Sequence, residues 1–189
     1  ASPDWLLELA AVDAAQPFPE PDAADRKAVR DLLRHGGFKP SGRSKPCSEY
    51  IRGVALQQRF PIINAAVDAT NVAALHGAMP VSTVDLDRLA GPLRVGIAPS
   101  GERYVFNLSG QEIDLSGLLC LFDDQGPCAN SVKDSQRAKT TDGSTRTMTI
   151  LWGTTGLPGR SEALQAWMVT LYERLGATVA VVPAVPTPA

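Results

Sequence analysis

The segment from Ile62 to Asp85 (I-I-N-A-A-V-D-A-T-N-V-A-A-L-H-G-A-M-P-V-S-T-V-D) constrains the fold of this chain more than any other. From residue 62 to residue 75 it is apolar on nearly every side, which is typical of a helix buried inside a protein. Gly77 is suited to the helix C-cap, and Pro80 to the loop that follows. We therefore expect a buried helix that ends shortly before Gly77 and delivers residues 81–85 directly beside it.

Three polar residues interrupt this apolar stretch. Asn64, Asp68 and Asn71 are spaced i, i+4 and i+7, so a helix stacks them as one polar stripe. Buried polar groups need hydrogen-bond partners. The stripe is therefore either an internal network that ties the helix to the next loop or a surface that faces a ligand, and the pattern leaves both interpretations open.

The composition is that of an ordinary globular domain. With 189 residues, of which 44% are hydrophobic and 20% are charged, the chain is long enough for one well-packed core. Its formal net charge of -2 gives no overall reason to expect an anionic polymer as partner. No signal-peptide pattern and no apolar run of about 18 residues is visible, so we expect a cytoplasmic protein without a membrane span.

Basic residues are nevertheless concentrated between positions 26 and 52. They form either the solvated face of an amphipathic helix with a basic loop, or a surface that meets phosphates. Acidic residues in the same segment offset them only in part. The cluster consists of Arg26, Lys27, Arg30, Arg34, His35, Lys39, Arg43, Lys45 and Arg52.

The cysteines argue against a structural metal. Cys47, Cys120 and Cys128 form no C-x-x-C pair and have no histidine at zinc spacing. Cys120 and Cys128 flank a turn at 123–126 and could face each other across a hairpin. An odd number of cysteines without a secretory framework favours free thiols in a reducing compartment. We expect no metal and no organic cofactor.

Hydrophobic periodicity changes from helical to strand-like after residue 92, which predicts an α+β single domain with a largely antiparallel or mixed sheet flanked by helices. Residues 1–21 are expected to form a docking helix and proline-rich linker, residues 22–182 the domain, and residues 183–189 a flexible tail. The expected helices are 4–15, 22–36, 48–58, 62–75 and 161–175, the last capped by Ser161. The expected strands are 93–98 and 103–107, joined by a turn as a hairpin, then 118–122 and 127–132 as a second hairpin, 146–152, and an edge strand at 178–182.

Familiar catalytic signatures are missing from the sequence. It contains no G-x-S-x-G, H-E-x-x-H, phosphate-binding G-x-x-x-x-G-K-[ST] or G-x-G-x-x-G after a strand. A Ser/His/Asp triad would need His76, at the end of the central helix. A surface or helix-capping role suits that histidine better.

A second polar run, N-S-V-K-D-S-Q-R-A-K-T-T at residues 130–141, is either an exposed loop or a functional one. Together with Ser82, Thr83 and Asp85, its side chains can hold a polar ligand and position a water molecule without a strong base. This hypothesis requires Asn71, Ser82 and Asp85 to open onto one concave pocket beside the loop.

The order of several short motifs resembles one known family. V-D-A-T-N at 67–71 is followed by P-V-S-T-V-D-L-D-R-L at 80–89, then by G-P-L-R-V-G-I-A at 91–98 and G-E-R-Y at 101–104. This order and spacing resemble the B3/B4 editing and tRNA-binding domain of the bacterial phenylalanyl-tRNA synthetase beta subunit, and still more its free-standing versions. The resemblance covers about residues 30–150 and also includes D-S-Q-R at 134–137.

The resemblance implies an α+β fold and, in the synthetase, hydrolysis of the ester that links a wrong amino acid to tRNA. The synthetase commonly carries a histidine two residues after the loop proline, where this chain has Ser82. It also uses an acidic residue near the end of the late strand, whereas residues 147–153 (T-M-T-I-L-W-G) contain none.

The first hypothesis is accordingly a trans-acting aminoacyl-tRNA deacylase that binds the aminoacyl end of tRNA. Its alternatives are a non-catalytic module that binds tRNA or an amino acid, and a hydrolase of a small amide or ester. The catalytic candidates are Ser82, Asp85 and Asn71. The candidates for substrate binding are Asn64, Asp68, Thr83, Asn130, Asp134, Ser135 and Arg137. The candidates for RNA contact are Arg26, Lys27, Arg30, Arg34, Lys133 and Lys139.

Overall fold

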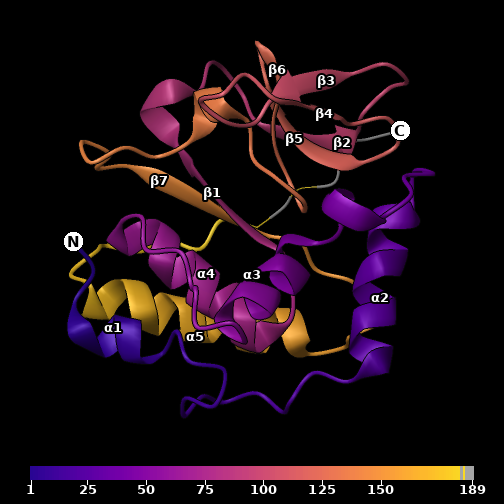
Figure 1. Ribbon diagram of the computed structural model, residues 1–189. Coiled ribbons are helices and arrows are strands. Elements are labelled where there is room, and N and C mark those ends of the chain that lie inside the picture. The colour runs from indigo at the N-terminus through magenta and orange to yellow at the C-terminus, as the bar shows by residue number, and fades with distance from the viewer. Residues whose placement is uncertain (184, 186–189) are drawn as a thin grey trace.

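Helices and strands occupy opposite sides of the molecule in the computed structural model, which describes residues 1–183 and 185 (Figure 1). The prediction of a single α+β domain with antiparallel strands flanked by helices is confirmed. The helices are α1 (Asp4–Glu8), α2 (Ala23–Arg34), α3 (Cys47–Ala55), α4 (Ala65–Gly77) and α5 (Arg160–Arg174). Short 3-10 turns are η1 (Gly42–Ser44), η2 (Leu86–Arg88) and η3 (Gln136–Ala138). In this described part of the chain, no helix has the length and apolar character needed to cross a membrane.

The strands form three small antiparallel sheets. They are β1 (Val81–Asp85), β2 (Arg94–Ile97), β3 (Arg103–Val105), β4 (Glu112–Asp114), β5 (Leu119–Asp123), β6 (Gly126–Asn130) and β7 (Thr147–Leu151). β1 pairs with β7, β2 and β6 flank β5, and β3 pairs with β4. The predicted hairpin of β5 and β6 is confirmed. The predicted hairpin of 93–98 with 103–107 is wrong, because β2 pairs with β5 and β3 pairs with β4.

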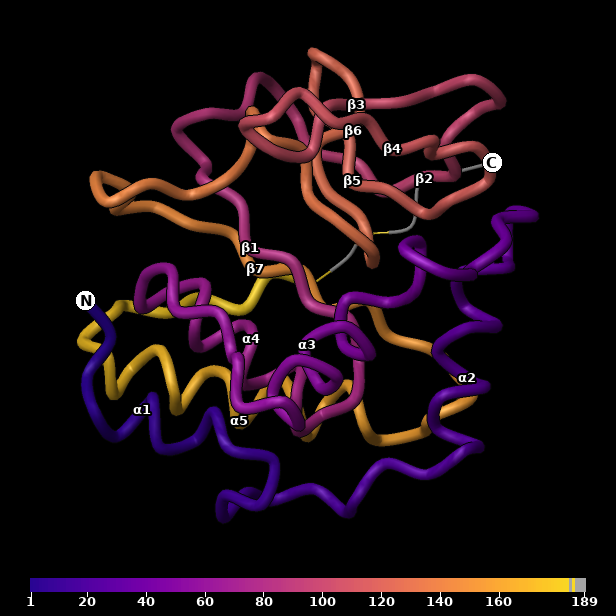
Figure 2. The backbone as a smooth tube through the Cα atoms, viewed as in Figure 1, coloured from indigo at the N-terminus to yellow at the C-terminus, as the bar shows by residue number. Residues whose placement is uncertain are grey.

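The β1–β7 pair is the centre of the molecule, and Figure 2 shows it running between the helices and the remaining strands. All five β1 residues are buried. Successive side chains of a strand point to opposite faces. Val84 accordingly packs with Leu121 and Trp152 on the strand side, whereas the Thr83 hydroxyl hydrogen-bonds to helix side chains. β1 therefore contributes to both layers.

The buried helix α4 follows the sequence prediction with two corrections at its ends. It begins at Ala65, because Asn64 is the N-cap and its side chain accepts the N–H of Val67 at 3.1 Å. Its left-handed C-cap is Ala78, with φ of 55°, and not the predicted Gly77. A Cβ atom added to Gly77 would lie only 2.5 Å from the Leu164 side chain of α5, so this glycine permits the close packing of the two helices.

The ends of the chain differ most from the prediction. α1 stops at Glu8 and does not continue to residue 15, because the Leu9 carbonyl hydrogen-bonds to Nε2 of His76 at 2.7 Å and the chain turns there. The predicted strand at 178–182 is wrong, since these residues form no ladder with any described strand. Gly159, with φ of 76°, and not Ser161, is the N-cap of α5. Most of the predicted tail at 183–189 lies outside the described residues.

A close backbone contact fixes the end of α2 against the strand layer. A Cβ atom at Gly36 would lie 2.3 Å from the Gly117 carbonyl oxygen, and one at Gly117 would lie 2.3 Å from the Gly36 carbonyl oxygen. Gly117 also has φ of 75°, a conformation that glycine adopts without steric cost. The loop that follows α2 is thereby held beside the turn that follows β4.

Candidate functional site

Ser82 lies in the interior, between β6 and β7. Its Oγ donates to the Asn130 carbonyl oxygen at 3.0 Å and accepts the Trp152 Nε1–H at 2.9 Å. Only 1% of Ser82 is exposed. The Ser82 hydroxyl is thus held on two sides by groups of the protein itself.

Asp134 lies next to this serine and is the most perturbed carboxyl group of the region. Burial raises the pKa of Asp134 to about 7, although the nearby Ser82 hydroxyl and the hydrogen bond from the Asn130 N–H favour its charged form. Its Oδ1 accepts the Asn130 N–H at 3.2 Å. The residue retains some exposed surface. We call Ser82, Asn130, Asp134 and Trp152 the buried polar centre.

The Asn130 side chain connects this centre to the β3–β4 sheet. Its Oδ1 accepts the N–H groups of Val132 and Lys133 at 2.7 and 3.0 Å, and its Nδ2 donates to the Tyr104 hydroxyl. The Tyr104 hydroxyl in turn donates to the Lys133 carbonyl oxygen. Asn130 therefore fixes the start of the 130–141 segment, and its own polar atoms are used within the protein.

Thr83 belongs to a separate hydroxyl cluster on the helix side of β1. The Tyr172 hydroxyl lies 2.8 Å from Thr70 Oγ1 and 2.9 Å from Thr149 Oγ1, and Thr83 Oγ1 hydrogen-bonds to both threonines. These residues come from α4, β1, β7 and α5. The cluster joins the two layers, so Thr83 and Ser82 face different surroundings although they are adjacent in sequence.

Two of the three residues of the predicted polar stripe have structural partners. Asp68 accepts the N–H of Ile63 at 2.8 Å and the Ser2 hydroxyl at 2.6 Å, and Asn64 donates to Thr140 Oγ1 at 3.0 Å. Asn71 is partly exposed, and its side chain makes no hydrogen bond to any described residue. The internal-network interpretation therefore describes Asn64 and Asp68, whereas the amide of Asn71 is left available.

Asp85 is buried and acts on the local backbone. Its Oδ1 accepts the Asp87 N–H at 3.0 Å at the start of η2, and its Oδ2 accepts the Ser144 hydroxyl. Asn71, Ser82 and Asp85 line neither of the two cavities that flank the loop after α2. The common pocket required by the sequence hypothesis is not formed there, and the catalytic roles of the three residues stay predictions.

Arg137 and Ser135 hold the η3 segment in place. Arg137 forms a bidentate ion pair with Asp123, at 2.8 and 2.6 Å, and also donates to the Gly126 carbonyl oxygen at 2.9 Å. Burial would raise the pKa of Asp123, but the hydrogen bonds from Arg137 and from two backbone N–H groups outweigh it and lower the pKa. Ser135 Oγ accepts the Arg137 N–H at 3.2 Å. Both residues contact the protein itself, and their substrate contacts stay predictions.

Most cations of α2 have acidic or carbonyl partners. Arg30 forms a bidentate pair with Glu49, with both distances 2.7 Å, while Lys27 and Arg34 both contact Asp31. Arg26 donates to the Pro21 carbonyl oxygen. Most of the positive charge on this face of α2 is therefore paired within the protein. The predicted contact of these residues with RNA stays a prediction.

His76, Cys120 and Cys128 are also buried, and Cys47 is partly exposed. His76 is 3% exposed and burial lowers its pKa, so the expected surface position is wrong while the hydrogen bond to Leu9 fits a structural role. All three cysteines are free, and burial raises the pKa of Cys47, Cys120 and Cys128 to about 12 each. Across residues 1–183 and 185, no three His, Cys, Asp or Glu side chains are grouped to hold a metal ion.

Sequence reasoning missed the aromatic members of the site. Trp152, Tyr104 and Tyr172 each place a polar group against a candidate residue or its neighbour. Buried tyrosine and tryptophan commonly direct their O–H or N–H at a partner. This preference indicates that each of these aromatic residues has a hydrogen-bond partner, but the sequence does not identify the partner because it lies far away along the chain.

Comparison with known proteins gives two consistent matches. Residues 42–155 match the family described as the B3/4 domain. The chain is also 32% identical over 122 residues to the phenylalanine–tRNA ligase beta subunit of Pseudomonas syringae pv. syringae (strain B728a), a match that includes 57% of this chain. The aligned region spans 15% of the length of that relative.

Proposed function

This chain belongs to the B3/4 domain family, and on that premise we propose that it is a trans-acting deacylase that hydrolyses the ester of mischarged aminoacyl-tRNA. The similarity to a phenylalanine–tRNA ligase beta subunit supports a role connected with tRNA synthetases. Action in trans is supported by the resemblance of residues 46–49, 61–64 and 134–140 to free-standing versions of the domain. A cytoplasmic location is part of the same proposal.

The observation that carries the proposal is the Asp134 carboxyl group beside Ser82, with its pKa raised to about 7 by burial. A general base works best when its pKa lies near the working pH. In the proposed step, Asp134 takes a proton from water as the water oxygen bonds to the ester carbonyl carbon. The carbon–oxygen bond to the ribose then breaks, and the ribose oxygen receives the proton.

Ser82 acts in this scheme as a positioning residue. Its hydroxyl has a single proton, which the structure directs at the Asn130 carbonyl oxygen, and its burial separates it from solvent. Asn71, whose amide makes no hydrogen bond to the described residues, is the proposed substrate-binding residue on α4. No step of the scheme needs a metal or an organic cofactor.

The test is release of labelled amino acid from a panel of correctly charged and mischarged tRNAs. Hydrolysis above the spontaneous rate is expected for at least one mischarged tRNA, with a rate that rises with pH to a plateau above about 7. Asp134→Asn is expected to lower this rate by about 10²-fold or more. Asp142→Asn, an exposed change in the same loop region, is the matched control. The proposal fails if no tRNA is hydrolysed, or if Asp134→Asn behaves like the control.

A non-catalytic module that binds tRNA or an amino acid is the second candidate, favoured by one observation. Both hydrogen-bonding directions of the Ser82 hydroxyl are occupied within the protein. Saturable binding of aminoacyl-tRNA without turnover by the wild-type protein would select this candidate over the deacylase.

A further inference from the structure

A groove lies between the loop that follows α2 and the β3–β4 hairpin. Its cavity of about 770 Å³ has Phe38, Lys39 and Arg43 on one wall and Phe106 and Lys133 on the other. A second cavity of about 410 Å³ borders the same loop and extends to Arg34. We call Phe38, Lys39, Arg43, Phe106 and Lys133 the basic groove. It is separate from the buried polar centre, which lines neither cavity.

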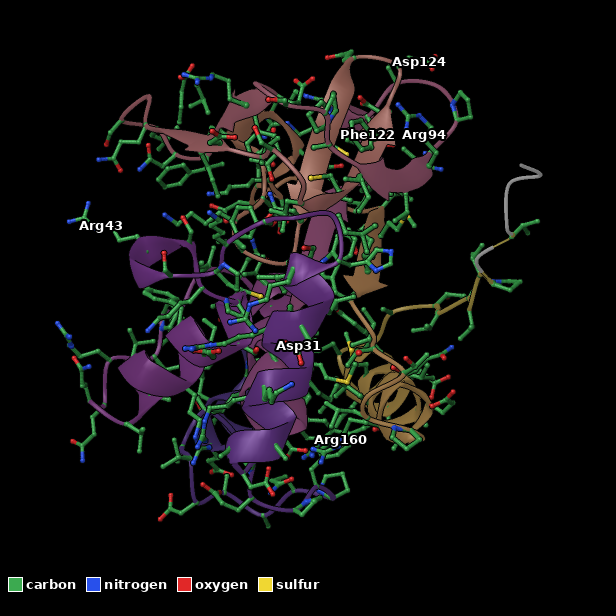
Figure 3. All side chains as sticks on the ribbon, turned by 90° about the vertical axis from the view of Figure 1, so that its right-hand side faces the viewer. Asp31, Arg43, Arg94, Phe122, Asp124 and Arg160 are labelled. Atoms are coloured by element: carbon green, nitrogen blue, oxygen red, sulfur yellow. The ribbon has the colours of Figure 1, made fainter. Side chains whose placement is uncertain are left out.

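The cations of the basic groove have no acidic partners. Among the described residues, no carboxylate forms an ion pair with Lys39, Arg43 or Lys133. Lys39 and Arg43 are exposed, and Figure 3 shows Arg43 reaching outward from its turn. Burial and the nearby charges of Arg43 and Lys139 lower the pKa of Lys133. A bound anion would relieve this repulsion.

The acidic residues of the groove are already engaged. Glu112 pairs with Arg103 at 3.4 Å, and Asp114 accepts the N–H and the hydroxyl of Ser116 at 2.8 and 2.6 Å. These contacts lie along β4 and the turn after it, whereas the unpaired cations lie on the α2 loop and after β6. The groove is therefore mixed in composition but has an excess of uncompensated positive charge on two facing walls.

Aromatic rings stand beside these cations. Phe38 and Phe106 are both partly buried in the groove walls, where they pack against the main core. The Lys133 Nζ lies 4.0 Å from the centroid of the Phe106 ring. Cations that follow a backbone and aromatic rings that stack on bases are the two elements of sites for single-stranded nucleic acid.

The groove is held by rigid parts of the fold. The close contact of Gly36 with Gly117 fixes the α2 loop beside the strand layer. On the opposite wall, the Lys139 Nζ donates to the Phe106 carbonyl oxygen at 2.6 Å, and Tyr104 bonds to the Lys133 carbonyl oxygen. A preorganised site loses less entropy when a ligand binds.

We propose that the basic groove binds the unpaired 3′ end of an RNA, with Lys39, Arg43 and Lys133 on the phosphates and Phe38 and Phe106 against the bases. The choice of RNA over another phosphate-bearing ligand rests on the proposed function in tRNA deacylation. The volume of the cavity suits one or two unpaired nucleotides and not a duplex, whose bases are closed to stacking. The groove thus guides the strand that leads to the reacting ester.

Fluorescence anisotropy with a labelled single-stranded RNA of sequence ACCA tests the proposal. Lys39→Glu and Arg43→Glu are each expected to weaken binding about tenfold or more. Each is also expected to reduce the slope of log Kd against log salt concentration by about 0.7 for every phosphate that is no longer neutralised. Phe38→Leu is expected to weaken binding about fivefold or more. Arg59→Glu, the same charge change at an exposed position outside the groove, is the control and should stay within about twofold.

Three outcomes would overturn the proposal: no binding of the RNA, equal losses in Arg43→Glu and Arg59→Glu, or an affinity for AMP equal to that for the tetranucleotide. The two proposals fail separately. RNA binding without hydrolysis of any charged tRNA keeps the groove and rejects the deacylase. Hydrolysis with an unchanged KM in Arg43→Glu keeps the deacylase and rejects the groove.

Discussion

The buried polar centre and the basic groove are both rich in polar side chains, but they differ in whether those side chains have partners. In the centre, the Ser82 hydroxyl is bonded on both sides and Asn130 uses its amide within the protein. In the groove, Lys39 and Arg43 are exposed and unpaired among the described residues. Polar groups that satisfy one another specify the fold, whereas unpaired ones are available to a ligand.

The polar segment at residues 130–141, which is one continuous run in the sequence, contributes to both regions. Residues 130–141 contribute Asn130 and Asp134 to the centre and Lys133 to the groove. One polar loop therefore contacts both sites, and its η3 anchor keeps them in a fixed relation. Substitutions in the two regions should differ sharply in their effect on stability.

The largest difference is expected between Arg137→Ala and Arg43→Ala. Removing Arg137 leaves the Asp123 carboxylate, whose side chain is 0% exposed, without its ionic partner, at a cost of about 3–5 kcal/mol in unfolding free energy. Removing the exposed Arg43 should change stability by about 0.5 kcal/mol or less. Urea denaturation measures both. Similar losses in the two variants would contradict the contrast between paired and unpaired groups.

Asp134→Asn should change how stability depends on pH. The folded-state pKa of about 7 lies above the ordinary value near 4, so folding favours the protonated carboxyl group. Its contribution is present below about pH 4 and is lost as the pH rises through about 7, a difference of about 3–4 kcal/mol. The Asn variant should lose this slope, and Asp142→Asn should keep it. Parallel curves for the wild type and Asp134→Asn would show that Asp134 titrates normally.

The groove wall can be tested with two glycines that share one backbone conformation. Gly117 and Gly110 both have φ of 75°, but a Cβ atom at Gly117 meets the Gly36 backbone, whereas one at Gly110 has nothing within 4 Å. Gly117→Ala should therefore cost about 1–3 kcal/mol more than Gly110→Ala, because only the first adds a steric clash. Thermal unfolding of the two variants isolates this term. Equal losses would mean that the Gly36–Gly117 contact adjusts freely.

Ser82→Ala should affect the stability of the buried polar centre and leave RNA binding in the basic groove unchanged. The substitution leaves the Trp152 N–H and the Asn130 carbonyl group without this partner, at a cost of about 1–3 kcal/mol. RNA binding in the groove should remain within about twofold of the wild type, since Ser82 does not line it. Chemical denaturation measures the unfolding free energy of this variant, and RNA titration measures its affinity. A loss of RNA binding without a loss of stability would show that the buried polar centre and the basic groove form one site.

Local features of the fold were predictable, and distant pairings were not. The helix α2 and the buried helix α4 follow from residues a few positions apart. The pairing of β2 with β5 could not be read in this way, because their register depends on packing between strands that are not adjacent in sequence. The strand expected at 178–182 had β-branched residues but no ladder partner, and strand propensity depends strongly on such context.

The same limit applies to the candidate site. The motif order located Ser82 and the 130–141 segment, and the basic cluster included Lys39 and Arg43. What the sequence lacked was the relation between them: Trp152 hydrogen-bonds to Ser82 across a separation of 70 residues, and Lys133 and Arg43 line the same groove. That the Ser82 hydroxyl has all its hydrogen-bond partners within the protein, and that Lys39 and Arg43 are exposed, follows from the tertiary structure alone.

The end of α4 offers a direct route to a more stable protein. Close packing against α5 requires a glycine at position 77, while the left-handed turn one residue later is occupied by Ala78 at φ of 55°. Close packing at position 77 and the left-handed conformation at position 78 both favour glycine, but only position 77 has one. Ala78→Gly should relieve about 1 kcal/mol of backbone strain without touching either polar region, which makes it a suitable background for the destabilising variants above.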